Sequence, residues 1–500
     1  MNRISVIQIF LYLIVSLAFA LPLEARMMFL STTGEDSVSC RAGAVFRTLG
    51  RAAECLAPGD TLIVRPGIYD GGVWVTVKAT AEAPVLIQGE SLEAEVDSST
   101  ADMPDAIRIQ DASYVTLDRI TVRKAIRAGC GVRFSNHITI TNSRFGDNGV
   151  WGIFTSFADD IRFEGNECFG SKKEHGIYHS NSGDRFVIRG NIVHHNSGNG
   201  LHMNGDPEMG GDGVLNWGVV EKNIIYNNGY SGGAGINMTH VHDILVRNNL
   251  VYKNYAGGIT IYQDTGTFEQ GSKRVLVMGN TVYFRPGEGR SGVNVQTTTE
   301  KVLIAGNIFV SGVANRGAIE VNSDHLSTIV SDRNVLWSVD TTKIIERKGR
   351  LTGIEAWRAL SGNDLHSLVA EPKFASIDSA DFTLDSASPA VAAGMTIDSV
   401  REILERLGGF EWILSRLDSL PGEDIRGRLR PTAAPPDAGA YEREVLYDFN
   451  GDGLFNLADA VALIILSLDN PDDPRLDVNR DGGYSIADVI RVLMILLRPA

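Results

Sequence analysis

Two short acidic segments near the end of the chain have the residue types and spacing of calcium-binding loops. Each places Asp, Asn or Ser oxygens at positions 1, 3, 5, 9 and 12, a carbonyl at position 7 and Gly at the sharp turn in position 6. Ca²⁺ takes roughly six to eight oxygen ligands, and this spacing wraps them around one ion. We therefore expect Ca²⁺ as a cofactor. The predicted ligands are Asp448, Asn450, Asp452, Leu454, Asn456 and Asp459, and, 29 residues later, Asp477, Asn479, Asp481, Gly483, Ser485 and Asp488.

An amphipathic apolar run follows each loop, at 460–468 and 489–497, and predicts one helix per loop. Two loops with one following helix each, and with Asp at position 12, resemble a type I dockerin. The resemblance implies a small α-helical calcium-binding module at 444–500 and a cohesin-like or cell-surface protein as its partner. Positions 10 and 11 are Leu457-Ala458 and Ile486-Ala487 in place of the Ser/Thr pairs common where cohesin binds. A cap on the rest of the chain, or another surface partner, therefore stays open.

Histidine is concentrated in one part of the chain. Seven of the ten histidines lie between 175 and 242, next to charged residues and a Gly-rich acidic loop at 204–213. Such a group of titratable side chains predicts acid–base chemistry. His179 is expected to point inward as a core residue. The seven are His175, His179, His194, His195, His202, His240 and His242.

This group contains candidates for a lyase acting on a uronate polymer. Such an enzyme needs a base for the proton at C5, a positive group on the carboxylate and an acid for the leaving oxygen. His202 or Lys173 is the expected base. Arg185 would neutralise the carboxylate, and Tyr178 would donate the proton.

The acidic loop offers two alternatives. A glycoside hydrolase needs two carboxylates across the bond, and Asp206 with Asp212 would form that pair. Alternatively, Asp206, Glu208 and Asp212 hold a Ca²⁺ ion.

The elements that must position these residues form a repeat from about 107 to 337. Asn recurs in the context apolar-x-x-Asn-x-apolar at intervals of 24 to 32 residues, with Gly-apolar-x-apolar between the instances. A period in this range, with short alternating runs, predicts a solenoid of stacked short strands. The Asn amide can bond the same amide in the next turn. The longer intervals predict inserted loops at about 206–218 and 264–273. The repeated asparagines are Asn142, Asn166, Asn191, Asn223, Asn249, Asn280, Asn307 and Asn334.

Alternation along the strands predicts two outward rows on one face, rich in aromatic, amide and hydroxyl groups that suit a sugar chain. The first row is Arg133, Phe154, Tyr178, His202, Asn237, Thr260, Asn294 and Glu320. The second row is Ser135, Ser156, Ser180, Asn204, Thr239, Tyr262, Gln296 and Asn322.

Several segments resemble secreted, pectate-lyase-like β-helix proteins. They imply a mostly-β, right-handed parallel β-helix at 28–337 with an N-terminal cap, a capping helix at 44–55, and closing segments within 338–443. Lyases, hydrolases, epimerases and adhesins share this scaffold. The segments are 32–36, 46–49, 56–61 and 65–69 at the start, and 382–384, 388–391 and 436–442 at the end.

Export is predicted from the first twenty residues. Arg3, an apolar stretch and Ala18-Phe19-Ala20 read as a signal peptide over 1–20, with no membrane span after its cleavage. Of the four cysteines, Cys40 and Cys55 are the expected disulfide, whereas Cys130 and Cys168 pair or stay as buried thiols. The net charge of -15 argues against a nucleic-acid partner.

Together these features predict a secreted or cell-surface protein with a polysaccharide partner. An enzyme like a polysaccharide lyase, acting on an acidic glycan, is expected first. A hydrolase or epimerase on the same scaffold, and a non-catalytic glycan-binding or adhesion protein, are the alternatives.

Overall fold

The computed structural model describes residues 25–420, 422–431, 435–443, 448–450, 455–471, 473–478 and 484–496, in two compact units, Met1–Glu442 and Arg443–Ala500. The expected signal peptide, 1–20, lies outside the described residues. Within the described part of the chain, every helix is too short or too polar to cross a lipid bilayer.

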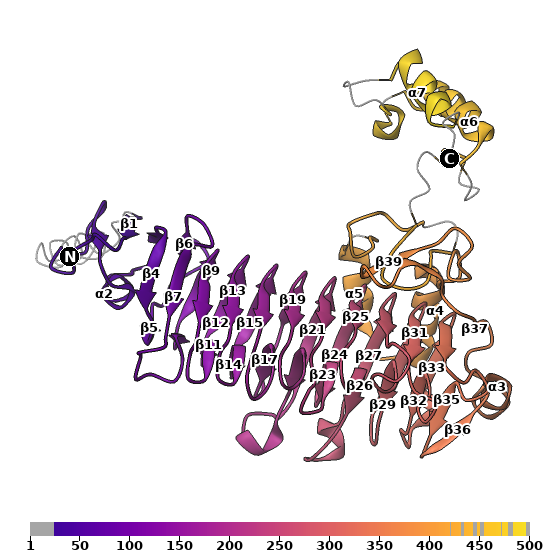
Figure 1. Ribbon diagram of the computed structural model, residues 1–500, viewed down its shortest axis with the longest axis horizontal. Helices are drawn as coiled ribbons and strands as arrows, with labels where there is room; N and C mark the ends of the chain where they lie inside the picture. The colour runs from indigo at the N-terminus through magenta and orange to yellow at the C-terminus, as the bar shows by residue number, and fades with distance from the viewer. Residues whose placement is uncertain are drawn as a thin grey trace, which may run out of the picture. The chain divides into compact units, whose positions relative to one another are not determined.

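Three long sheets of stacked, parallel strands build the first unit (Figure 1). The three sheets are named A, B and C. In each turn of the solenoid the chain passes through sheet C, then sheet A, then sheet B, and returns to sheet C. Each strand therefore pairs with the strands one turn before and one turn after it. The predicted parallel β-helix is confirmed.

The strands of sheet A are β1 (Met27–Leu30), β2 (Val45–Phe46), β3 (Thr61–Val64), β6 (Val85–Gly89), β9 (Ser113–Asp118), β12 (Asn136–Thr141), β15 (Asp159–Glu164), β18 (Phe186–Arg189), β21 (Leu215–Glu221), β24 (Val241–Arg247), β27 (Lys273–Met278), β30 (Glu300–Ala305) and β33 (Ile329–Asp332). Those of sheet B are β4 (Gly67–Asp70), β7 (Ala94–Asp97), β10 (Thr121–Arg123), β13 (Arg144–Gly146), β16 (Glu167–Phe169), β19 (Ile192–His194), β22 (Ile224–Tyr226), β25 (Leu250–Tyr252), β28 (Thr281–Tyr283), β31 (Ile308–Ser311), β34 (Val335–Ser338) and β37 (Leu368–Val369). Those of sheet C are β5 (Val73–Val75), β8 (Ile107–Gln110), β11 (Ala128–Arg133), β14 (Trp151–Ser156), β17 (Ile177–Ser180), β20 (Leu201–Asn204), β23 (Ala234–Thr239), β26 (Gly257–Tyr262), β29 (Val293–Val295), β32 (Ile319–Val321), β35 (Ile345–Arg347) and the antiparallel β36 (Arg350–Thr352).

Asparagine side chains form a ladder at the turn from sheet A to sheet B. Asn223, for example, accepts from the Asn191 amide at 2.9 Å and donates to Asn249 at 2.9 Å, and it is fully buried. The predicted amide ladder is therefore confirmed from Asn166 to Asn334. The prediction that Asn142 belongs to the ladder was wrong. The register places Ser143 in the ladder, and Asn142 precedes it with a left-handed backbone and donates to Asp118.

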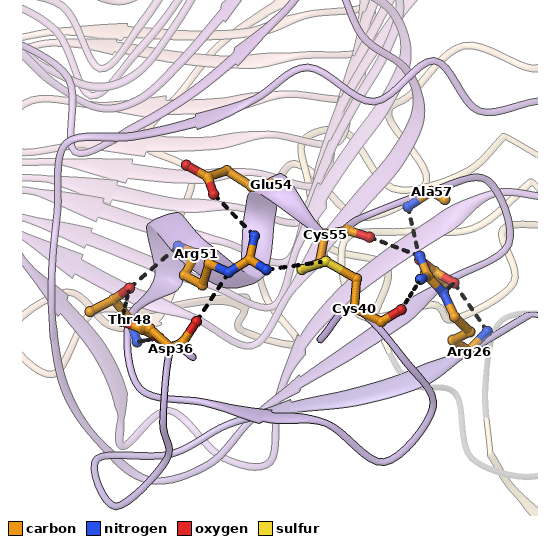
Figure 2. Close-up of a disulfide and its surroundings, with 9 residues drawn as sticks. Arg26, Asp36, Cys40, Thr48, Arg51, Glu54, Cys55 and Ala57 are labelled. Atoms are coloured by element: carbon orange, nitrogen blue, oxygen red, sulfur yellow. Dashed lines mark hydrogen bonds and ion pairs between the residues drawn. A yellow bond between two sulfur atoms is a disulfide. The ribbon is translucent and has the colours of Figure 1, made fainter. Parts of the chain in front are cut away.

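The N-terminal cap is held by a disulfide between Cys40 and Cys55, which confirms that pairing (Figure 2). The Arg26 guanidinium donates to both cysteine carbonyls, at 2.7 and 2.8 Å. The capping helix α2 is shorter than expected, at Leu49–Glu54, because the two residues of β2 pair with β1 before Thr48 caps the helix. Cys130 and Cys168 are buried free thiols.

The region 338–443 does more than close the solenoid. Helix α3 (Ile354–Ser361) places Trp357 in the main core at the far end. Helices α4 (Ile397–Leu407) and α5 (Glu411–Ser419) instead cover part of the outer face of sheet A. A hairpin of β38 (Phe374–Ser376) and β39 (Asp381–Leu384) packs on sheet B. These helices were not predicted.

The second unit contains the two predicted helices, α6 (Leu457–Asp469) and α7 (Ile486–Leu496), each directly after its loop. Leu463 and Val492, both fully buried, lie in the small core between them.

Candidate functional site

Two rows of outward side chains cross sheet C. Phe154, Tyr178 and His202 are stacked in register in the first row, which continues through the later strands. The prediction that Arg133 lies in the first row was wrong. Arg133 pairs with Ser156 of the second row, and Gly131 occupies the position in the first row. Gly131 has no side chain, so an alternation of outward side chains cannot identify its position. The first row is Trp74, Arg108, Gly131, Phe154, Tyr178, His202, Asn237, Thr260, Asn294, Glu320 and Glu346.

His175 and His202 form a hydrogen-bonded pair next to Tyr178. The Asn199 backbone N–H donates to His175 Nδ1 at 3.0 Å, so a neutral His175 carries its proton on Nε2 and donates it to His202 Nδ1 at 2.9 Å. Burial lowers the pKa of His175 to about 3. Burial, with His175 nearby, also holds the pKa of His202 well below its usual range. Both rings are therefore neutral at pH 7.

This pairing leaves His202 Nε2 as an N–H donor. The atom is buried, and it has no hydrogen-bond partner among the described residues. With Nδ1 already accepting from His175, the ring has no accessible lone pair to remove a proton. The expected role of His202 as the base does not follow from this geometry, which leaves Nε2 as a buried N–H donor.

Tyr178 and Tyr262 lie on either side of a patch of amides. Asn204 Nδ2 donates to the Tyr178 hydroxyl and Asn237 Nδ2 to the Tyr262 hydroxyl, each at 3.3 Å. Burial raises the pKa of Tyr178 to about 12 and raises that of Tyr262. The Tyr178 ring stacks on His202, with 4.8 Å between centroids. Both phenols keep their protons at neutral pH, so Tyr178 is suited to the expected role of proton donor.

Both long insertions leave the solenoid at the corner between sheets C and A. They contain the short 3₁₀ helices η1 (Pro207–Met209) and η2 (Phe268–Gln270). The Gln270 side chain of the second loop donates to the Asp212 carbonyl of the first at 2.8 Å. The two predicted insertions are thus confirmed, and they support each other at one edge of sheet C.

The loops bring Asp206 near Asp264. Burial raises the pKa of Asp206, and the charge of Asp264 raises it further. Asp264 Oδ1 lies 2.7 Å from Nε2 of the buried His240. Asp212 is the expected partner of Asp206, but its charge acts on Asp184. Burial is the main cause of the raised pKa of Asp184, and the charge of Asp212 raises that pKa further. The carboxylates whose charges act on Asp206 are therefore Asp264 and Glu208, rather than Asp212.

Two other expected site residues lie elsewhere. Arg185 precedes β18 of sheet A, where its guanidinium bonds Asp160 at 2.8 Å. It is not brought to His202, because the turn between β17 and β18 carries it onto the next sheet. Lys173 is exposed in the segment before β17. In the described part of the chain, no three His, Cys, Asp or Glu side chains are grouped for a metal, so Asp206, Glu208 and Asp212 are not assembled as a calcium site.

A groove of about 340 Å³ continues from Asn237 and Tyr262 along sheet C. Arg290 and Arg316 line its far part together with Glu320. Arg316 Nη1 lies 3.0 Å from Glu346 Oε1, and the Ser291 hydroxyl donates to Glu320 at 2.8 Å. Neither arginine was predicted, because both lie in turns outside the repeated strand motif. Amides, hydroxyls and guanidiniums along one groove can bind the hydroxyls and carboxylates of a sugar chain.

The predicted calcium loops are described in part. Asp452, Leu454, Asn479, Asp481 and Gly483 lie outside the described residues. Of the others, the buried Asp459 accepts from the backbone N–H of Phe449 at 2.8 Å and of Asn456 at 2.7 Å. Asp488 accepts in the same way from Ser485 at 2.7 Å. The carboxylate at position 12 of each loop thus accepts hydrogen bonds from the backbone of its own loop. The predicted ligand atoms are all oxygens, which is the ligand type that Ca²⁺ prefers. The other predicted ligands within the described residues are Asp448, Asn450 and Asp477.

Comparisons with known proteins agree with this architecture. The family model for the right handed beta helix region matches residues 85–210. The uncharacterized protein YwoF of Bacillus subtilis (strain 168) is 26% identical over 463 residues, which cover 73% of this chain and 92% of YwoF. The crystal structure of pectate lyase Pel9A superposes with a TM-score of 0.54 at 15% identity, over 85% of this chain and 98% of that one. A rhamnogalacturonan lyase gives 0.44 at 12% identity, over 76% and 98%. With the register of the three sheets, the family match and the superposition on pectate lyase Pel9A show that the first unit is a right-handed parallel β-helix.

Proposed function

We propose that the protein acts on an acidic polysaccharide outside the cell, along the outer face of sheet C. The observation that carries the proposal is the groove along sheet C, with Asn237 and Tyr262 at one end and Arg290 and Arg316 at the other. Tyr178 lies two turns before Asn237 in the same outward row. Similarity to a pectate lyase structure supports this use of the scaffold.

The chemistry we propose is elimination from a uronate. Asp206, whose pKa is raised by burial, takes the proton from C5, and the C4–O bond breaks with its electron pair going to the leaving oxygen. Tyr178 gives that oxygen its proton. An unsaturated uronate and a new chain end result, and the Asp206 proton then returns to Tyr178 through solvent. Arg290 and Arg316 bind carboxylates of neighbouring sugars in the groove.

The test is a substrate screen of the mature protein, with Ca²⁺, on pectate, alginate, chondroitin and neutral glycans. Ultraviolet absorbance of unsaturated uronates and new reducing ends are followed together. Tyr178→Phe is expected to lower the rate about 100-fold or more because it removes the donor. Tyr226→Phe, on the outer face of sheet B, is the matched control. Equal rates for Tyr178→Phe and the parent would refute the assignment, and reducing ends without absorbance would indicate a hydrolase.

A non-catalytic glycan-binding protein is the second candidate. The burial of His202 Nε2 and the engagement of Asp264 with His240 favour it, since both reduce the number of groups free for proton transfer. Retention on a pectate or alginate column, with no new ends on any substrate, is the result that this candidate predicts.

For the second unit we propose calcium binding and attachment to a protein partner at the cell surface. Exposed apolar residues recur at equal positions in the two helices, 29 residues apart. They are Leu457, Val461 and Ile465 in α6, and Ile486, Ile490 and Met494 in α7. Calcium added to the chelated full-length protein should be taken up at two sites in a calorimetric titration. Absence of uptake would contradict the calcium proposal.

A further inference from the structure

The outer face of sheet A changes character along the solenoid. In the later turns its outward residues are apolar, such as Leu245, Leu276 and Leu303, and α4 and α5 cover them. In the earlier turns the equivalent positions are Thr116, Thr139 and Arg162, which no helix covers in the described residues. The cover ends at α5, and a groove of about 650 Å³ begins there.

One wall of this groove is a column of bulged residues, one per turn, at the start of the sheet A strands. Each has a left-handed backbone with φ between 53° and 61°, so its side chain leaves the regular alternation of the strand. With strands about 4.8 Å apart, five turns span roughly 19 Å. The column consists of Tyr114, His137, Asp160, Arg185 and Trp217.

Aromatic faces line the groove at both ends. The rings of Tyr114 and His137 are stacked, with 4.1 Å between centroids, and Trp217 lies further along the same wall. Trp412 of α5 faces them from the other wall. Flat rings along an elongated groove suit the CH faces of successive pyranose rings.

Guanidinium groups stand between the rings. Arg185 donates from Nε to Asp160 and from Nη2 to both Asp160 and Asp159, and among the described residues Nη1 has no such bond. The Arg416 guanidinium carbon lies 5.1 Å from the centre of the Trp412 ring on the opposite wall. Four arginines line the groove, with Asp160 as its single lining carboxylate. A guanidinium with unused N–H donors binds a carboxylate.

We propose that this sheet A groove is a second polysaccharide-binding site, which holds an extended segment of an acidic glycan away from the sheet C groove. The inference rests on the proposed function for its choice of ligand class. Rings would stack on Trp217 and Trp412, while Arg185 and Arg416 bind the carboxylates. Such a site would keep a long polymer on the protein without taking part in the reaction.

The test is native electrophoresis of the full-length protein through gels that contain polygalacturonate, alginate or uncharged dextran. Trp217→Asn removes the ring but suits the left-handed backbone, because Asn tolerates positive φ. Arg416→Gln removes one charge from the opposite wall, and Arg350→Gln is its control at an exposed site outside both grooves. Trp217→Asn and Arg416→Gln should each weaken binding to at least one acidic glycan about 3- to 10-fold. Arg350→Gln should leave binding unchanged, and salt should weaken binding to the acidic glycans.

Sheet C variants separate the two proposals. If Arg290→Gln and Arg316→Gln reduce binding while Trp217→Asn and Arg416→Gln bind as the parent does, the sheet A site is refuted and the sheet C proposal stands. If the sheet A variants alone reduce binding, the second site is supported and the sheet C groove loses its role. No retardation of the parent by any of the three glycans would refute the second site, and it would leave the sheet C proposal to the substrate screen.

Discussion

The outer faces of sheets C and A belong to the same turns of the same solenoid, yet they have different neighbours. Sheet C presents Asn237, Thr260 and Asn294 in its outward row and carries no helix in the described residues. Sheet A presents Leu276 and similar residues, which α4 and α5 bury. The inward residues are alike on both sheets, so they specify the solenoid. The outward row decides whether a face packs against the chain or stays open to a ligand.

The largest expected effect comes from exchanging the two kinds of outward residue. Leu276 is fully buried under the helices, so Leu276→Asp places an unpaired charge in an apolar contact and should lower the free energy of unfolding by at least about 3 kcal/mol. Thr260→Asp, on the adjoining strand of sheet C, should change it by less than about 1 kcal/mol. Urea midpoints measure both. Similar losses at the two positions would break the comparison.

A pH effect of intermediate size should come from the sheet C side. His175 is neutral in the folded protein with a pKa of about 3, whereas an unfolded histidine takes up a proton near its usual value of about 6.5. Stability should therefore fall as the pH drops from about 6.5 towards 3, by about 2 kcal/mol at pH 5 for this residue. His175→Gln should have a flatter dependence in thermal unfolding at pH 7 and 5. An unchanged slope would contradict this account.

The smallest effect is expected where sheet A is still open. Thr139→Leu places an apolar side chain in a turn that has no helical cover and that Arg162 separates from the apolar row, so it gains no packing partner. The free energy of unfolding should change by less than about 0.5 kcal/mol. A gain of 1 kcal/mol or more in the same urea experiment would show that the helices can reach further along the sheet.

Repetition explains what the sequence could predict. The asparagine ladder and the Gly-apolar motif recur along the chain, and the two insertions interrupt that recurrence, so the sequence alone predicts them. The assignment of Arg133 was wrong by one row because Gly131 leaves no mark on an outward pattern. Helices α4 and α5 occur once, outside the repeat, and their apolar faces match sheet A in three dimensions only.

The candidate site was predictable in composition but not in its pairings. Tyr178, His202 and Asp206 were named from their place in the strands and the first loop. That Asp206 meets Asp264, and that His175 orients His202, depends on contacts between turns that spacing cannot supply. The position of Arg185 could not be predicted for the same reason. The short turn after β17 places it directly before β18 of sheet A, away from sheet C.

The corner between sheets C and A, where both insertions emerge, is the place at which this fold can vary in length. Within each sheet a strand forms its backbone hydrogen bonds with the strands one turn away, so a segment added at that corner does not shift the pairing of any strand. Diversification and engineering can therefore proceed by changing these loops, one turn at a time. The loops alter what borders the sheet C groove, while the buried asparagines keep the stack aligned.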